Sequence, residues 1–482
     1  MNRKFYDSLR GKYKLPTISI DSIEIAVEDE FDTADTDEME ELRKHIAFLT
    51  RIYREVIVRH YLNGESVETI ANALQIPVGT VKSRLSSGRT HIKKGFDSME
   101  KYTKQSYEPQ VLHVGISGIQ GLNGEPYNIT ERNLIAQNLL ILAYEQPLTE
   151  TELAKAIGIP AAYIESVIES LVRNELMKRV GNKVYTDFII YSHNDVAKNI
   201  EPQRKLINDN FAVFWKPLQA GLNKLRSASF YVKMAERKRH KLEYYFLMHT
   251  MSQCFFGAGA KIYDGSHEYP QRPNGGQWVA MGYSYPQNYD YNNSEIHKYT
   301  WSGERTNEVH DTLGAKKLIL KVFDTPLEKQ RYFHTKSILE DDVLAKMLYI
   351  INKGITPSDT GIDMLYFENI PYLAECGVLH IEGGKPAVDI PILTKEEHSE
   401  LAKITGSVKD EFIPSALTFL TEHLKNARAK LPPDLKSVPE QKQYLEAMGC
   451  LHIFVVFRAK EEKAIMENIA YPCPPMVLIV EE

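Results

Sequence analysis

The sequence predicts a mainly helical α+β protein of several domains, with an N-terminal helix-turn-helix followed by two α/β modules. Three observations support this prediction. A helix-turn-helix pattern lies within residues 66–96. Two later stretches, 131–194 and 335–394, each combine helical periodicity with a hairpin pattern, and the second is similar to the first. Finally, 482 residues with 43% hydrophobic and 25% charged residues suit about three globular domains.

The helix-turn-helix pattern consists of two amphipathic helices separated by a short turn. Ser66 can cap the first helix. Apolar residues recur at helical spacing in that helix: Val67, Ile70, Ala71 and Leu74. Pro77 prevents the helix from continuing, and Gly79 can supply the conformational freedom of the turn. We therefore expect the second helix to begin near Thr80.

The second helix has an apolar face and a polar, cationic face. At 3.6 residues per turn, a narrow apolar stripe is formed by Val81, Leu85, Ile92 and Phe96. The opposite face and its flanks carry hydroxyls and cations: Thr80, Lys82, Ser83, Arg84, Ser86, Ser87, Thr90, Lys93 and Lys94. Hydroxyls and arginines can reach base edges, and lysines can neutralise phosphates. This face is the predicted DNA-binding surface; the alternative is a solvated face on an ordinary amphipathic helix.

Residues 42–96 resemble region four of bacterial sigma factors, especially the extracytoplasmic-function group. The matching segments are residues 53–57, 61–66, 70–71 and 76–85. The resemblance implies that the second helix reads the upstream promoter element and that the apolar back of the domain contacts the β flap of core RNA polymerase. Carried over by position, the DNA-facing residues are Thr80, Lys82, Ser83, Arg84, Ser87 and Arg89. Gly88 departs from the family, which has a helix-forming residue there.

Residues 1–41 are too few to hold region two, the polymerase-binding module of sigma factors. Residues 21–41 contain eleven Asp or Glu and no cation, a pattern typical of a disordered tail. Alternatively, the tail competes with DNA, because residues 42–104 carry twelve Lys or Arg against five acids. We expect a regulator with region four and without region two.

Residues 105–130 are rich in Gly and Pro and are predicted to be a linker. Residues 131–194 resemble a winged-helix domain, with three helices followed by a hairpin that turns at Gly181 and Asn182. The helix that would read DNA exposes Tyr163, Glu165 and Glu169. Because acids repel phosphates, packing or dimerisation is an alternative role for this helix.

The hairpin recurs after a shift of 202 positions, which predicts a duplicated module. The identical pairs are Leu171 and Leu373, Gly181 and Gly383, Lys183 and Lys385, Asp187 and Asp389, and Ile190 and Ile392. Residues 335–394 are thus a second winged-helix-like unit, which exposes Asp363, Glu368 and Glu375. A long amphipathic helix follows each hairpin, and a further helix and strand are expected at 236–256 and 439–457.

The partner regions of the two units are 195–334 and 395–482. Residues 263–301 hold nine Tyr or Trp, which suit a small-molecule pocket, a β-rich core or a protein interface. Several histidines fall close together, namely His240, His249, His267, His297 and His310, without a metal or catalytic motif. We therefore expect that the protein is not an enzyme and has neither catalytic residues nor a cofactor.

Composition indicates where the protein is located and how it can bind DNA. The net charge of −6 means that DNA affinity must be local. The cysteines, Cys254, Cys376, Cys450 and Cys473, lack metal-ligand spacing and suit a reducing cytoplasm. No long apolar segment occurs, so no membrane association is expected.

The sequence as a whole predicts a cytoplasmic transcription regulator that binds double-stranded promoter DNA through residues 80–94 during transcription initiation. Core RNA polymerase is the expected protein partner, while a homodimer and a small-molecule effector are left open. The alternative is a non-enzymatic adaptor that uses the region four-like domain to contact RNA polymerase or a partner sigma factor.

Overall fold

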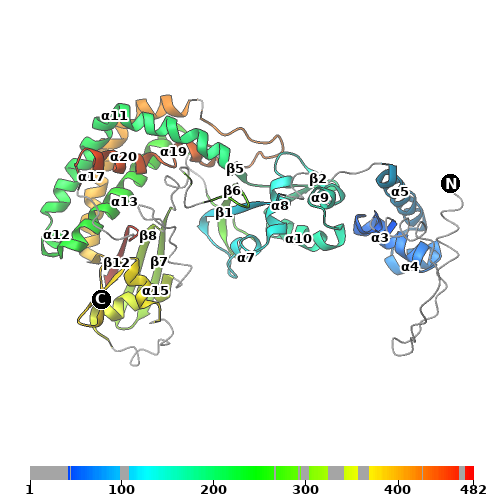
Figure 1. Cartoon of the computed structure of the whole chain (residues 1–482), viewed down its shortest axis with the longest axis horizontal. Helices are drawn as coiled ribbons and strands as arrows, with labels where there is room; N and C mark the ends of the chain where they lie inside the picture. The colour runs from blue at the N-terminus through cyan, green and yellow to red at the C-terminus, as the bar shows by residue number, and fades with distance from the viewer. Residues whose placement is uncertain are drawn as a thin grey trace. The chain divides into compact units, whose positions relative to one another are not determined.

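The computed structural model describes most of the chain after residue 41 (Figure 1). The described residues are 42–43, 45–97, 108–264, 268–290, 294, 303–323, 341–355, 368–425, 427–465 and 473–482, with the side chains of 94–97 left out. The predicted acidic tail therefore lies outside the described residues. The described part is mainly helical with small sheets. It divides into two compact units, one of residues 1–191, 269–288 and 431–438, and one of the remaining residues.

Unit 1 begins with a small helical domain. Its elements are α3 (Arg51–Ile57), the π-helix η2 (Val58–Leu62), α4 (Val67–Leu74) and α5 (Val78–Asp97). Their apolar faces close on a shared core, in which the best-buried residues include Val56, Ile57, Ile70, Val81 and Leu85.

The rest of unit 1 combines four helices with two small sheets. The helices are α7 (Tyr127–Thr130), α8 (Leu134–Leu142), α9 (Glu150–Ile157) and α10 (Ala161–Arg173). One sheet has the order β2-β4-β3, formed by β2 (Leu148–Thr149), β4 (Lys183–Thr186) and β3 (Met177–Val180). The other has the order β1-β6-β5, formed by β1 (Gln110–Ile119), β6 (Gln277–Pro286) and β5 (Ile189–Ser192).

The predicted linker at 105–130 is wrong over residues 110–119, which form β1. This strand pairs antiparallel with β6, with Gln110 opposite Pro286 and Ile119 opposite Gln277. Leu112 and Val114 face the core, as alternation along a strand requires. The glycines that suggested a loop have a packing role, since a side chain on Gly118 would meet the carbonyl oxygen of Gln277.

Strand β6 comes from the aromatic-rich segment that was assigned to the partner region. Trp278 is fully buried in the core of unit 1, and Tyr283 stacks on Tyr191 of β5 with ring centroids 5.9 Å apart. The aromatic residues of this strand therefore form a β-rich core, one of the three roles that the sequence left open. Trp301 lies outside the described residues.

Unit 2 contains the second hairpin unit and a four-stranded sheet. The helices are α15 (Asp341–Lys353) and α16 (Ile370–Glu375), and the hairpin is β9 (Leu379–Glu382) with β10 (Lys385–Val388). The sheet has the order β11-β12-β8-β7, formed by β11 (Ile392–Thr394), β12 (Met476–Glu481), β8 (Ala315–Phe323) and β7 (Glu304–Thr312). The segment between α15 and α16, including Asp363, lies outside the described residues.

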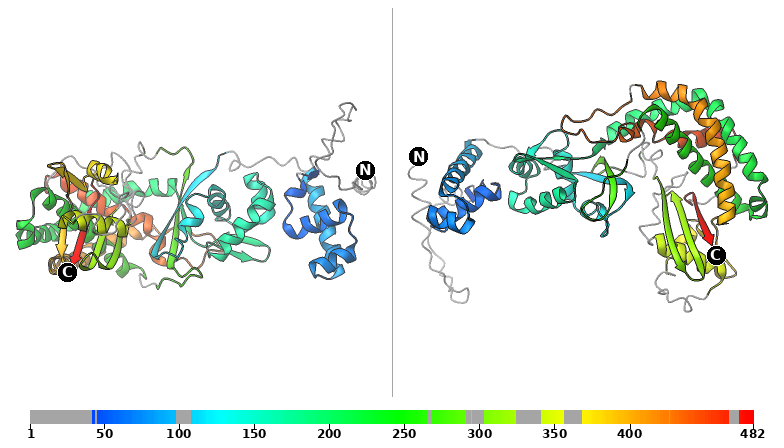
Figure 2. Two further views of the ribbon diagram at one scale, coloured as in Figure 1. Left: turned by 90° about the horizontal axis from the view of Figure 1, so that it is seen from below. Right: turned by 180° about the vertical axis from the view of Figure 1, so that it is seen from behind.

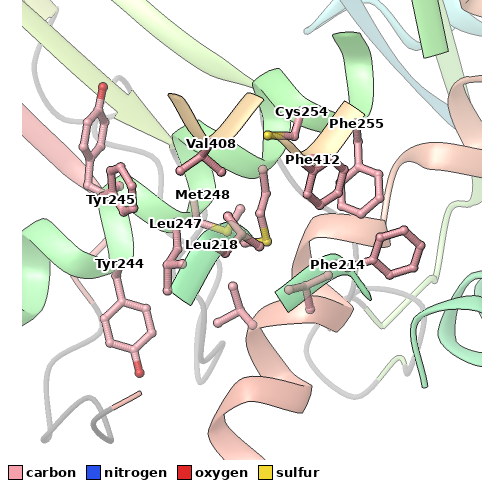
Figure 3. Close-up of a cluster of buried hydrophobic side chains, with 14 of the residues drawn as sticks. Phe214, Leu218, Tyr244, Tyr245, Leu247, Met248, Cys254, Phe255, Val408 and Phe412 are labelled. Atoms are coloured by element: carbon pink, nitrogen blue, oxygen red, sulfur yellow. The ribbon is translucent and has the colours of Figure 1, made fainter. Parts of the chain in front are cut away.

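The remaining helices of unit 2 include three long ones, α11 (His193–Ser227), α13 (Glu236–Ile262) and α17 (Lys395–Leu424). The shorter ones are α12 (Ser229–Lys233), α18 (Glu440–Gln443), α19 (Leu445–Met448) and α20 (Leu451–Glu461). Helices α11 and α13 both pack on α17, and α20 packs on both α11 and α13 (Figure 2). Large apolar side chains fill the space between them, among them Phe214, Phe255 and Phe412 (Figure 3).

The strands predicted within 236–256 and 439–457 are wrong, because these segments are helical. Tyr244, Tyr245 and Phe246 have high β propensity but are buried within α13. Burial among the bundle helices outweighs this local preference. The strands of the two modules come later, as β6 and β12.

The two hairpin units share backbone details as well as sequence. Leu176 N–H donates to the Leu171 carbonyl, and Val378 N–H donates to the Leu373 carbonyl 202 positions later. The next helix in each case begins with a capping box, at Ser192 before α11 and at Thr394 before α17. The strand orders β1-β6-β5 and β8-β12-β11 also correspond. These correspondences support the predicted duplication.

Candidate nucleic-acid interface

The turn between α4 and α5 is built by local hydrogen bonds. The Ser66 side chain caps α4 by accepting from Thr69 N–H at 3.1 Å, as predicted. At the other end, Gln75 has a left-handed backbone with φ of 52°, and Ile76 N–H returns to the Ala71 carbonyl. The helix therefore ends in a Schellman-type turn.

This geometry corrects the predicted role of Gly79. The left-handed residue of the turn is Gln75, whereas Gly79 lies inside the first turn of α5. Helix α5 begins at Val78, before the predicted start at Thr80, because the Pro77 carbonyl already accepts from Thr80 and Val81. Proline is well suited to this position, since its missing N–H is not needed there.

The apolar face of α5 is buried as predicted. Val81, Leu85 and Ile92 are at most 8% exposed, while the side chain of Phe96 lies outside the described residues. A Cβ atom on Gly88 would lie 2.9 Å from Cγ1 of Ile57 in α3. The departure from the family at Gly88 therefore has a physical reason: α3 and α5 approach too closely there for a side chain.

The opposite face of α5 presents most of the predicted DNA-binding residues to solvent. The exposed ones are Lys82, Ser83, Ser86, Thr90 and Lys93, and the partly exposed ones are Thr80, Arg84, Ser87 and Arg89. The side chain of Lys94 lies outside the described residues. Two hydroxyls donate back to helix carbonyls, Ser83 to Thr80 at 2.9 Å and Thr90 to Ser86 at 3.0 Å. Their oxygens remain able to accept from a ligand.

Arg89 differs from the other predicted residues because it is held by the domain itself. Its Nη1 donates to the hydroxyl of Tyr61, in η2, at 3.0 Å. Tyr61 lies in a segment that matches the family, but its role could not be predicted, because helical periodicity does not connect positions 61 and 89. Tyr61 fixes Arg89 at the flank of the exposed face.

Three cations of the exposed face have no acidic partner within the described part of the domain. There, no acidic side chain forms an ion pair with Lys82, Arg84 or Lys93. Arg59 of η2, in contrast, pairs with Glu55 and Glu65. The result is a polar helix face with unpaired cations, which is the composition that phosphates and base edges recognise.

His249 and the cysteines lie among residues of the fold. His249 contacts the Glu304 carboxylate at 3.0 Å, and Tyr245 donates to the same carboxylate. The cysteines are all buried, and burial raises the pKa of Cys254 to about 12. Over the described residues no group of three or more potential ligands is placed to hold a metal ion. No described helix is long and apolar enough to span a membrane.

Residues 39–92 match the family model for sigma-70, region 4. This match confirms the resemblance inferred for the N-terminal helical domain and indicates a DNA-binding, transcription-related role. Domains of this family typically bind promoter DNA and RNA polymerase. No curated protein and no solved structure matches the chain.

Proposed function

We propose that the chain regulates transcription initiation by binding promoter DNA through α5. The observation that carries this proposal is the exposed face of α5, where Lys82, Arg84 and Lys93 lack acidic partners among the described residues. Helix α4 and the Gln75 turn hold α5 in the helix-turn-helix arrangement, which presents a helix of this kind to the major groove.

In this mechanism, cations and hydroxyls have separate tasks. Lys82 and Lys93 neutralise phosphates and make the affinity depend on salt. Arg84 and Ser83 lie where they can contact base edges, so sequence preference depends on them. Arg89, held by Tyr61, contributes a cation of fixed orientation at the flank.

We also infer that each repeat contains a winged-helix unit. The first has the order α8-β2-α9-α10-β3-β4 with a β2-β4-β3 sheet, which suits that fold. Exposed acids, Glu169 on α10 and Glu368 and Glu375 in the second repeat, make both units poor DNA readers. Glu165, which was predicted to be exposed, is instead only 13% exposed and pairs with Arg54. Their expected role is contact with protein.

The test uses the full-length chain with labelled duplex DNA and with core RNA polymerase. Fluorescence anisotropy should show salt-dependent binding of the chain alone, and addition of core polymerase should tighten promoter binding. If the chain binds polymerase but neither wild type nor an Arg84→Ala variant discriminates between promoter and random DNA, the alternative function as an adaptor holds instead.

A further inference from the structure

Helix α10 presents an acidic residue to the N-terminal domain within unit 1. The Glu165 carboxylate accepts from Arg54 Nη2 at 2.7 Å through one oxygen and from the Arg51 backbone N–H at 2.7 Å through the other. The side chains of this pair are 19% and 13% exposed, so water screens it less than a surface pair. In a winged-helix unit, a helix in the position of α10 would read DNA. Here α10 contacts the N-terminal helical domain instead.

Glu165 also completes the N-terminus of α3. The first amides of a helix have no partner within the helix, and Arg51 is the first residue of α3. The preceding residue, Thr50, makes no side-chain capping hydrogen bond. A carboxylate from α10 takes that place and interacts favourably with the helix dipole.

Further contacts orient this interface. Arg54 Nη1 donates to the Leu49 carbonyl at 2.7 Å, which directs the guanidinium toward α10. Phe48 packs against the core formed by α8, α9, α10 and β1. A cleft lies between the N-terminal helical domain and helices α9 and α10. Ile52 and His91 of the domain line this cleft, whereas Lys82, Ser86 and Lys93 do not. The contact thus uses a different side of the domain from the proposed DNA-binding face.

We propose that α10 is a docking surface for the N-terminal helical domain, with Glu165 as its central residue. Docking leaves the cationic face of α5 free. It also fixes the direction in which this face points relative to residues 131–194. The docking itself stands on the contacts of Glu165, and only its meaning for promoter recognition rests on the proposed function.

The test is photo-cross-linking in the full-length chain. The photoreactive residue p-benzoylphenylalanine replaces Ile52, which is 47% exposed and lines the cleft. Irradiation should join this position to peptides of α9 or α10, identified by mass spectrometry. In Glu165→Arg the yield should fall about tenfold, as expected for loss of charge-assisted hydrogen bonds.

Two variants make the result specific. Glu145→Arg makes the same change of charge as Glu165→Arg, but at an exposed position between α8 and β2. This variant should keep the wild-type cross-linking yield. Arg54→Glu combined with Glu165→Arg should recover part of the yield, because the ion pair is restored while the cap on Arg51 is not. Circular dichroism of each variant confirms that the helices remain folded.

Cross-links to peptides outside α9 and α10, or a yield that Glu165→Arg leaves unchanged, would overturn the proposal. The measurement contains no DNA, so its failure leaves the proposed function standing. Conversely, a chain that docks as described but binds no DNA would refute only the function.

Discussion

Gly88 lies inside α5 at the point where this helix contacts Ile57 of α3. Glycine within a helix usually costs about 1 kcal/mol relative to alanine, and Gly88 departs from the family, which has a helix-forming residue there. In the structure its hydrogen atom faces Ile57, and a Cβ atom would lie 2.9 Å from Cγ1 and 3.1 Å from Cδ1 of that residue. The requirement comes from a tertiary contact, which local sequence does not contain.

Gly88→Ala and Gly79→Ala should therefore have opposite effects on α5. Gly79 has open space around its Cβ position, so alanine there should stabilise the helix by about 0.5 kcal/mol. At Gly88 overpacking should exceed the propensity gain and destabilise by about 1 kcal/mol. Hydrogen exchange of α5 peptides in the full-length chain measures both. Slower exchange in both variants would contradict the close packing at Gly88.

Substitutions on the exposed face should separate affinity from specificity. Lys93→Ala should weaken binding to all duplexes alike and reduce the slope of log affinity against log salt by about one unit. Arg84→Ala should reduce discrimination between preferred and random duplexes by about 1–3 kcal/mol. Anisotropy titrations at several salt concentrations measure both effects. An equal loss on both kinds of DNA for Arg84→Ala would remove its proposed role in reading bases.

At the scale of elements, sequence was most informative where capping and periodicity are local. Ser66 caps α4 as predicted, because both ends of the hydrogen bond lie within one helical turn. The stripe of Val81, Leu85 and Ile92 is buried as its spacing indicates. The cap and the apolar stripe were therefore sufficient to predict the helix-turn-helix without tertiary information.

The elements that sequence missed depend on distant partners. Strand β1 pairs with β6, more than 150 positions away, and its glycines resemble a linker until that pairing is known. Helix α13 contains aromatic residues typical of strands, yet its partners in α17 and α20 decide its conformation. The ends of these elements could not be predicted from neighbouring residues alone.

Helix α20 should make the stability of unit 2 sensitive to acid. Burial lowers the pKa of His452 from 6.5 to about 4, and burial also lowers the pKa of His423. The unfolded chain therefore binds more protons below pH 6.5, so stability is fully present above that pH and is lost as the pH falls toward 4. Between pH 7 and pH 5 His452 alone should account for roughly 2 kcal/mol.

Calorimetry of the full-length chain checks this dependence. His452→Leu should flatten the fall in the unfolding temperature of unit 2 between pH 7 and pH 5. His310→Gln, at an exposed position of β7, should retain the fall. A steep fall that persists in His452→Leu would show that other groups govern the acid sensitivity.

At the scale of the whole molecule, the sequence predicts a duplication but not the differences between its two copies. Asp187 and Asp389 occupy corresponding positions, and the N–H of each donates to the corresponding carbonyl, of Leu176 and Val378. Their side chains differ in surroundings. Asp389 pairs with Lys241, whose side chain is 9% exposed, and with the more exposed Arg237, whereas Asp187 pairs with Lys178, which is 49% exposed. Lys241 and Arg237 come from α13, which sequence did not connect to the hairpin.

The two aspartates should therefore differ in their contribution to stability. Asp389→Ala leaves the Lys241 ammonium buried without its carboxylate and should cost about 3–5 kcal/mol. Asp187→Ala removes a partly screened pair and should cost about 1 kcal/mol or less. Denaturant unfolding followed by probes in each unit compares them. Equal losses would mean that the charge cluster around Asp389 is not an important stabilising feature of unit 2.

The central claim is that α5 enters the major groove of duplex DNA. Dimethyl sulfate protection tests it most directly, because guanine N7 lies in that groove. The full-length chain is first allowed to select duplexes from a random pool, and the selected DNA is then probed. We predict protected guanines in one short stretch and loss of that protection when Arg84 and Lys93 are both replaced by alanine. Binding without N7 protection, or protection that the double variant retains, would contradict the claim.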